Sequence, residues 1–246
     1  TKHYSAMAGC DGCAGGEVKD VEDVIGFTRP EMKSKELANS VDLYEHHVFV
    51  CCDVPISTWP SDVFSIGGPA QAINAAVKEA KDKIEGKVKV TVCECTDGDE
   101  DGDIIYFPPP MAGKKPMLLR GAEGGEFVEK MLAEGDFSAL RSVVLPLLQV
   151  FVCAHQKRDQ RCGHCGPVLC KALSAALEGA AQVRGCSHVG GHVYAGNVLA
   201  YAPPALEWYG YVTPGDVPAI AARVKGGPCP QELLRGRMGE GPTPPI

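Results

Sequence analysis

A short motif that occurs twice constrains the fold of this chain more than any other feature. Val48-Phe-Val-Cys51 recurs letter for letter as Val150-Phe-Val-Cys153, 102 residues further along the chain. Both copies have the β-branched and aromatic character of a buried strand. Each is followed by a loop and then by a Gly-Pro pair, which can open a helix because the first helical N–H needs no partner. The sequence therefore predicts two related halves that each begin with a strand and a helix.

The residues after each motif continue the same order of elements. In the first half we expect a helix from Gly68-Pro69, strands over 87–95 and 104–107, and a short helix over 126–133. In the second half we expect a helix from Gly166-Pro167, strands over 198–201 and 208–212, and a helix over 217–224. The shared order is what an ancient duplication would produce, although four matching letters can also arise by chance.

Strands that alternate with helices favour an α/β architecture. We expect the first strand–helix–strand unit of each half to be parallel and the last two strands to be antiparallel. This mixture is the thioredoxin-like arrangement, so the sequence predicts two tandem thioredoxin-like units with mixed sheets flanked by helices. The predicted segments are an irregular N-terminal stretch over 1–45, a first unit over 46–140, a second unit over 141–225 and an extended tail over 226–246.

Charge and hydropathy bound the possible partners and compartments. A net charge of −7 argues against a general nucleic-acid binder. The longest nearly apolar run, 143–154, is shorter than the roughly 20 residues that a membrane-spanning helix needs. No secretory signal is visible, so we expect an intracellular protein with reduced thiols. The chain begins at Thr1, which fits removal of a methionine or of an organellar presequence. We therefore expect a cytosolic, mitochondrial or chloroplast protein.

Two segments concentrate the side chains that can bind a metal. Cys153 ends a predicted strand, and Cys162 follows it across a loop with one lysine and two arginines, whose charges favour the thiolate form. His188-Val-Gly-Gly-His192 forms a turn, because two adjacent glycines cost a helix about 2 kcal/mol relative to alanine. Two thiolates and two imidazoles suit zinc or a [2Fe–2S] cluster of the Rieske type. The spacing matches neither class, so these residues alone leave the metal open.

The same residues resemble those of the sucrase/ferredoxin-like proteins, which are thioredoxin-like ferredoxins with a bis-histidinyl, non-Rieske [2Fe–2S] cluster. The matching pieces are Phe151-Val-Cys153 with Cys162, His188-Val-Gly-Gly-His192, Asn197, and Trp208-Tyr-Gly-Tyr-Val-Thr-Pro214. The resemblance covers about residues 145–225. It implies that Cys153, Cys162, His188 and His192 bind one [2Fe–2S] cluster, and that the first half, which has no second His-x-x-x-His, is a degenerate unit without ligands.

The resemblance implies an electron carrier without catalytic turnover, and nothing in the sequence resembles the carboxylate pair of a sucrase. Two neutral imidazoles give the oxidised site less negative charge than four thiolates would, so it should accept an electron more easily and in a proton-coupled way. The expected partners are redox proteins, a reductase or an acceptor. The alternatives are a thiol–disulfide protein that uses Cys162 and Cys165 and a structural or docking subunit of a larger redox complex. The role of Cys10 and Cys13 stays open.

Overall fold

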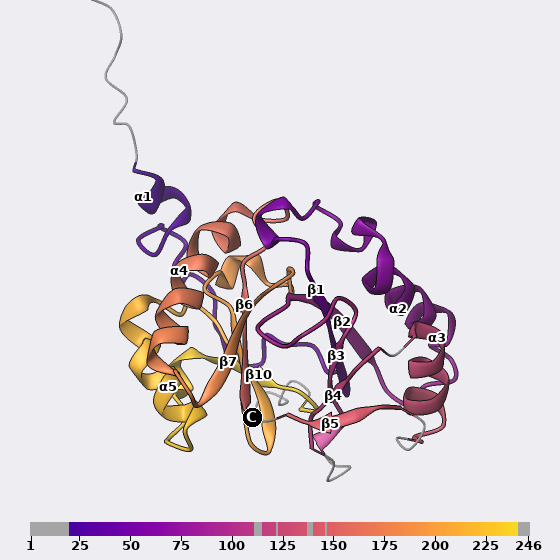
Figure 1. Ribbon diagram of the computed structural model, residues 1–246. Coiled ribbons are helices and arrows are strands. Elements are labelled where there is room, and N and C mark those ends of the chain that lie inside the picture. The colour runs from indigo at the N-terminus through magenta and orange to yellow at the C-terminus, as the bar shows by residue number, and fades with distance from the viewer. Residues whose placement is uncertain (1–19, 111–114, 122, 137–139, 146, 241–246) are drawn as a thin grey trace, which may run out of the picture.

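The computed structural model describes residues 20–110, 115–121, 123–136, 140–145 and 147–240 (Figure 1). The Cys10–Cys13 pair and the end of the predicted tail lie outside these residues. The strands are β1 (His46–Cys52), β2 (Val88–Glu94), β3 (Ile104–Phe107), β4 (Met117–Leu119), β5 (Ser142–Val144), β6 (Leu148–Cys153), β7 (Ala181–Cys186), β8 (Val198–Ala202), β9 (Ala205–Tyr209) and β10 (Leu234–Arg237). The helices are α1 (Val21–Ile25), α2 (Gly68–Glu79), α3 (Gly124–Glu126), α4 (Gln160–Ala176) and α5 (Val217–Val224), and a π-helical stretch, η4 (Phe127–Ala133), continues α3.

The described strands form one mixed sheet in the order β10-β9-β8-β6-β7-β2-β1-β3-β4-β5. In the first half β1 is parallel to β2 and antiparallel to β3. In the second half β6 is parallel to β7 and antiparallel to β8. Each half thus combines parallel and antiparallel pairs, as predicted for the first half. In the second half the prediction was wrong in one respect, because the predicted strand over 198–201 is antiparallel to β6 and the parallel partner is β7, which was not predicted. The halves join where β2 and β7 meet antiparallel, with Cys93 opposite Cys186.

The sheet curls until its two halves face each other. Two strands separate β1 from β6 in the sheet, which on a flat sheet would keep them about 14 Å apart. Yet the rings of Phe49 and Phe151 stack with centroids 3.6 Å apart. Phe107 on β3 and Tyr201 on β8 are also in ring contact, at 5.5 Å. The concave face of the sheet therefore encloses a core of its own.

The repeated motif explains how this double-sided packing arises. Val48 and Val50 point to a core that also contains residues of α2, whereas Phe49 and Cys51 point to the enclosed core. In the second copy the valines pack with residues of α4 and α5, and the Phe-Cys positions again face inward. Figure 1 shows α4 and α5 beside one half of the sheet and α2 and α3 beside the other. Because both faces are covered, each motif is continuously apolar.

Helix α4 begins earlier than its sequence predicts. The Asp159 side chain accepts a hydrogen bond from the Arg161 amide and caps the helix, so the helix begins at Gln160 and not at Gly166-Pro167. Pro167 therefore lies inside the helix, where it cannot donate to the carbonyl one turn earlier. This earlier start places Cys162 in the first turn of α4.

Five more elements were not predicted from the sequence. Helix α1 lies in the N-terminal stretch that was predicted to be irregular. Strands β4 and β5 extend the first half of the sheet, and β7 supplies the parallel partner of β6. Strand β10 pairs with β9, so part of the predicted extended tail belongs to the sheet. Within the described residues, no helix is both long and apolar enough to cross a bilayer.

Candidate metal centre

Three of the four predicted ligands converge where β6, α4 and the segment after β7 meet. The Sγ atoms of Cys153 and Cys162 and one ring nitrogen of His188 all lie within 4.8 Å of one another. His188 Nδ1 is 3.7 Å from each sulfur. Cys153 ends β6 and Cys162 lies in the first turn of α4, so the close packing of this helix on this strand brings the two sulfurs together.

Helix α4 can approach β6 so closely because Gly166 has no side chain. A Cβ at residue 166 would lie 2.5 Å from the Cα of Ala154 and 2.6 Å from the carbonyl oxygen of Cys153. Both of these atoms are backbone and cannot rotate away. The glycine that the sequence placed at the start of a helix therefore sets the distance between the helix and the strand that carry the two cysteines.

The two cysteine thiols are buried and contact each other. A hydrogen bond from Cys162 holds the pKa of Cys153 well below its ordinary value, with His188 adding to the effect against the cost of burial. The same contact, together with burial, raises the pKa of Cys162. One sulfur of the pair is therefore readily ionised, and a thiolate is the form that binds a metal.

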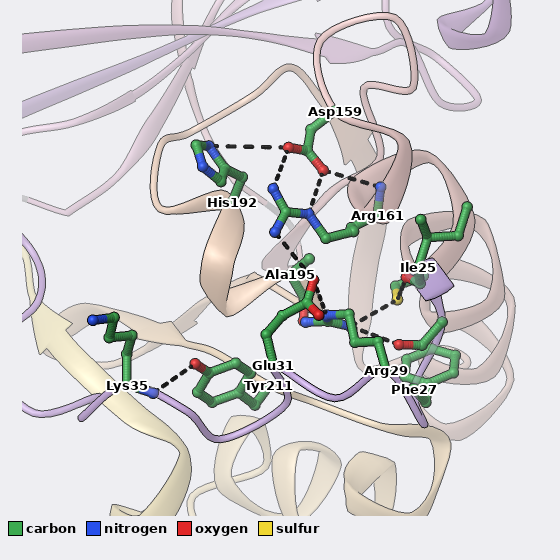
Figure 2. A network of polar contacts seen from close by, with 12 residues as sticks. Ile25, Phe27, Arg29, Glu31, Lys35, Asp159, Arg161, His192, Ala195 and Tyr211 are labelled. Carbon is green, nitrogen blue, oxygen red and sulfur yellow. Dashed lines mark hydrogen bonds and ion pairs between the residues drawn. The ribbon is translucent and has the colours of Figure 1, made fainter. Parts of the chain in front are cut away.

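The fourth predicted ligand, His192, lies at the edge of this group. Its ring stacks against that of His188, with centroids 6.0 Å apart. Its side chain is 59% exposed, and its Nδ1 is 4.0 Å from Oδ2 of Asp159 (Figure 2). His192 is therefore exposed next to His188 and lies outside the group of donor atoms that approach within 4.8 Å of one another.

Asp159 connects His192 to a chain of ionic contacts that reaches the N-terminal segment. Arg161 binds the Asp159 carboxylate through two guanidinium nitrogens and also contacts Glu31 (Figure 2). Glu31 in turn faces the buried Arg29, which donates to the carbonyl oxygen of Ala195 beyond the His192 turn. Residues before β1 therefore fix the helix start and the histidine turn relative to each other.

The turn between the two histidines is built from backbone that favours glycine. Gly190 and Gly191 have φ of +93° and +68°, in the left-handed region. The Asn197 side chain donates to the carbonyl oxygen of Gly191, and Arg235 from β10 donates to Asn197. This confirms the predicted turn and shows why it keeps its shape.

The remaining cysteines lie outside the donor group. Cys165 is buried, its Sγ contacts Arg29 and the Ile25 carbonyl, and burial raises its pKa to about 11. Cys51 and Cys93, on adjacent strands of the first half, have sulfurs 3.9 Å apart, and each is buried. None of the ten described cysteines forms a disulfide.

Asp159 and Arg235 surround the predicted ligands but were not singled out from the sequence. Asp159 carries one available signal, an acidic residue just before a helix. Arg235 carries none, because the strand that places it follows a stretch rich in proline and glycine.

Fold and site together define a mixed α/β protein with a compact group of thiols and imidazole that can hold a metal. A sequence model of the family described as Sucrase/ferredoxin-like matches residues 37–236. The chain belongs to this family. The family resemblance expected from the second half thus extends over most of the first half as well. No solved structure matches the chain with significant similarity.

Curated relatives match a shorter stretch. "Altered inheritance of mitochondria protein 32" of Candida glabrata is 37% identical over 100 residues, covering 36% of this chain and 32% of the relative. The protein of the same name from Debaryomyces hansenii is 38% identical over 96 residues, covering 36% and 35%. "Actin patches distal protein 1" of Saccharomyces cerevisiae is 40% identical over 86 residues, covering 29% and 27%. The matches thus span about a third of the length of these relatives or less.

Proposed function

We propose that this chain is a single-electron carrier that holds one [2Fe–2S] cluster through Cys153, Cys162, His188 and His192. The observation that carries the proposal is the convergence of two sulfurs and a ring nitrogen within 4.8 Å in a buried corner of the fold. Membership of a ferredoxin-like family supports it. When bound, such a cluster accepts and releases one electron at a potential set by its ligands and surroundings.

The chemistry of these residues supports that group, and so does the placement of three of the four. Two soft sulfurs and two imidazoles are the donor set of bis-histidinyl clusters, and one of the imidazoles, His188, faces both sulfurs. The buried cysteines would hold the inner side, and the exposed His192 would hold the outer side, where a partner protein could approach. Electron exchange needs no substrate cavity, only a short path from the surface to the site.

We further propose that Asp159 orients His192. Carboxylates commonly accept the second ring N–H of a ligand histidine and fix its orientation. Asp159 faces Nδ1 of His192, which would leave Nε2 as the ligand atom, whereas His188 presents Nδ1 to the sulfurs. Arg161 forms an ion pair with the Asp159 carboxylate and so fixes the group that would orient His192.

Thiol–disulfide exchange by Cys162 and Cys165 receives less support. Exchange needs an accessible thiol with a lowered pKa. Both thiols are buried, and burial contributes to a raised pKa at each of them. A structural or docking subunit of a larger redox complex is the second candidate, since the first half offers a large surface without predicted ligands.

Two wider aspects of the proposal rest on topology and relatives. The strand order β9-β8-β6-β7, with one parallel and two antiparallel pairs, supports a thioredoxin-like unit in the second half, and β1, β2 and β3 with α2 support a related first unit. The names of two relatives refer to inheritance of mitochondria, which supports a mitochondrial location among the intracellular compartments considered.

The ligand assignment can be tested with histidine-to-cysteine variants. We expect anaerobically purified wild-type protein to give a [2Fe–2S] EPR spectrum when reduced, and His188→Cys and His192→Cys to shift it. His164→Cys is the matched control, because His164 lies near the site on α4 but is bound to Glu22. Equal spectra for all three variants would refute the assignment. Failure of the wild-type cluster to take up an electron from a cellular reductase would favour the docking subunit.

A further inference from the structure

A pocket of about 540 Å³ lies beside the turn that joins the two histidines. Its walls come from the segment before β1, from the first residues of β2 and from Val189, Gly190 and Gly191. Trp208 of β9 and Arg235 of β10 complete it. The pocket thus shares its glycine wall with the candidate metal centre but contains none of the four predicted ligands.

Two cations inside this pocket, Lys89 and Arg235, make no ion pair with a carboxylate of the described residues. The Lys89 Nζ lies 5.2 Å from the centroid of the Trp208 ring, and it makes no hydrogen bond or ion pair within the described residues. Arg235 is 3% exposed and donates only to neutral acceptors, the side chain and carbonyl of Ser40 and the side chain of Asn197. In a chain with a net charge of −7, two recessed cations that make no ion pair are unusual.

The two cations also disfavour each other. Burial lowers the pKa of Lys89, and the charge of Arg235 lowers it further. Burial likewise lowers the pKa of Arg235 to about 10. Asp42, an exposed acidic residue of the pocket wall, opposes this by raising both pKa values, but burial outweighs it at each cation. An anion placed between the cations would remove this repulsion and replace lost hydration.

We propose that this pocket binds a small anion, a carboxylate or a phosphate, against Lys89 and Arg235. The ligand should be small because the cations are recessed in a cavity and do not project toward a partner surface. The volume suits an organic acid or a phosphate ester better than a lone inorganic ion. Lys89 and Arg235 both lie over the Trp208 ring, at 5.2 and 5.7 Å from its centroid, so the two cations meet on one wall of the pocket.

Binding there should act on the metal centre, a consequence that rests on the proposed function. Gly190 and Gly191 connect the two predicted histidine ligands and line the pocket. A negative charge near the site stabilises its more positive, oxidised form. The bound anion should therefore lower the reduction potential of the protein.

Isothermal titration calorimetry with inorganic phosphate and with citrate tests the proposal, at an ionic strength held constant with sodium chloride. We expect saturable binding of at least one anion at millimolar concentration or below, weakened about tenfold in Lys89→Gln. Lys78→Gln, which removes an exposed lysine from α2, is the matched control and should bind as the wild type does. Preference for phosphate would identify a phosphoryl ligand, and preference for citrate would identify a carboxylate.

A second variant covers the case in which Lys89→Gln fails to fold. Asp42 is exposed, so Asp42→Asn should fold and should bind the preferred anion about two to three times more tightly. Absence of binding to the wild type, or equal binding by wild type, Lys89→Gln and Asp42→Asn, would overturn the proposal. Calorimetry needs no cluster, so its result stands whether or not the metal assignment holds. If an anion binds but leaves the reduction potential unchanged, the pocket is confirmed as an anion site and its proposed effect on the metal centre is refuted.

Discussion

Replacing Gly166 by alanine should damage the metal centre through the packing of α4 on β6. The new Cβ would lie 2.5 Å from the Cα of Ala154, whereas ordinary contacts begin at 3.4 Å. The backbone on both sides cannot move independently, so the helix must retreat by nearly 1 Å. Cys162 lies on this helix and Cys153 at the end of this strand, so the same movement separates the two sulfurs.

The size of the effect follows from two opposing contributions. Overpacking costs about 1–3 kcal/mol, and alanine in a helix gains about 1 kcal/mol over glycine. We expect Gly166→Ala to lower the free energy of unfolding by about 1 kcal/mol, within a range of 0–2 kcal/mol. A metal site tolerates ligand displacements of only about 0.5 Å, so the loss of bound iron should be much larger than the loss of stability.

Urea denaturation and iron analysis of the purified variants measure the two effects separately. Gly125→Ala is the matched control, because a Cβ at that helical position meets nothing within 4 Å. It should leave stability unchanged or raised by up to about 1 kcal/mol, with full iron content. A Gly166→Ala protein that is as stable as Gly125→Ala and retains its iron would refute the packing argument.

Three further predictions concern charged and thiol side chains. Burial opposes ionisation of Glu207, but hydrogen bonds from two arginines and a tyrosine hold its pKa below the ordinary 4.5. Above pH 4.5 the ionised Glu207 should therefore make the wild type more stable than Glu207→Gln by about 2–3 kcal/mol. This difference in the free energy of unfolding should vanish as the pH falls through the lowered pKa, and urea titrations at several pH values would measure it. Asp159→Asn should keep iron but raise the reduction potential, because a negative charge near His192 is lost, and an unchanged redox titration would contradict this. Cys162→Ser should abolish iron binding while Cys165→Ser keeps it, and the reverse result in metal analysis would favour dithiol chemistry.

Much of the sheet could be predicted because its strands carry local signals. The duplicated Val-Phe-Val-Cys motif identifies β1 and β6, alternation identifies β2, and apolar spacing identifies α2 and α5. Strand β7 lacks such a signal, since it carries Arg184 at a buried position. That charge is satisfied by Asp99, 85 residues away, in a contact that no local pattern reveals. The curl of the sheet likewise depends on aromatic contacts between halves.

The candidate ligands were predictable because a family resemblance joins Cys153 and Cys162 to the distant histidine pair. The structure adds how closely three of them approach and leaves the ligand assignment itself a prediction. The contact of Asp159 with His192 and the pocket beside the histidine turn could not be inferred, because their residues come from elements that meet only in the folded chain. The start of α4 was misplaced because Gly166-Pro167 resembles a helix start, whereas the Asp159 cap fixes the start further upstream.

The most direct measurement is the iron and acid-labile sulfide content of anaerobically purified protein, taken with its visible spectrum. A bis-histidinyl cluster requires two iron and two sulfide ions per chain, and a coloured protein whose absorption bleaches on reduction. A colourless protein that carries one zinc ion per chain, with no sulfide, would contradict the account.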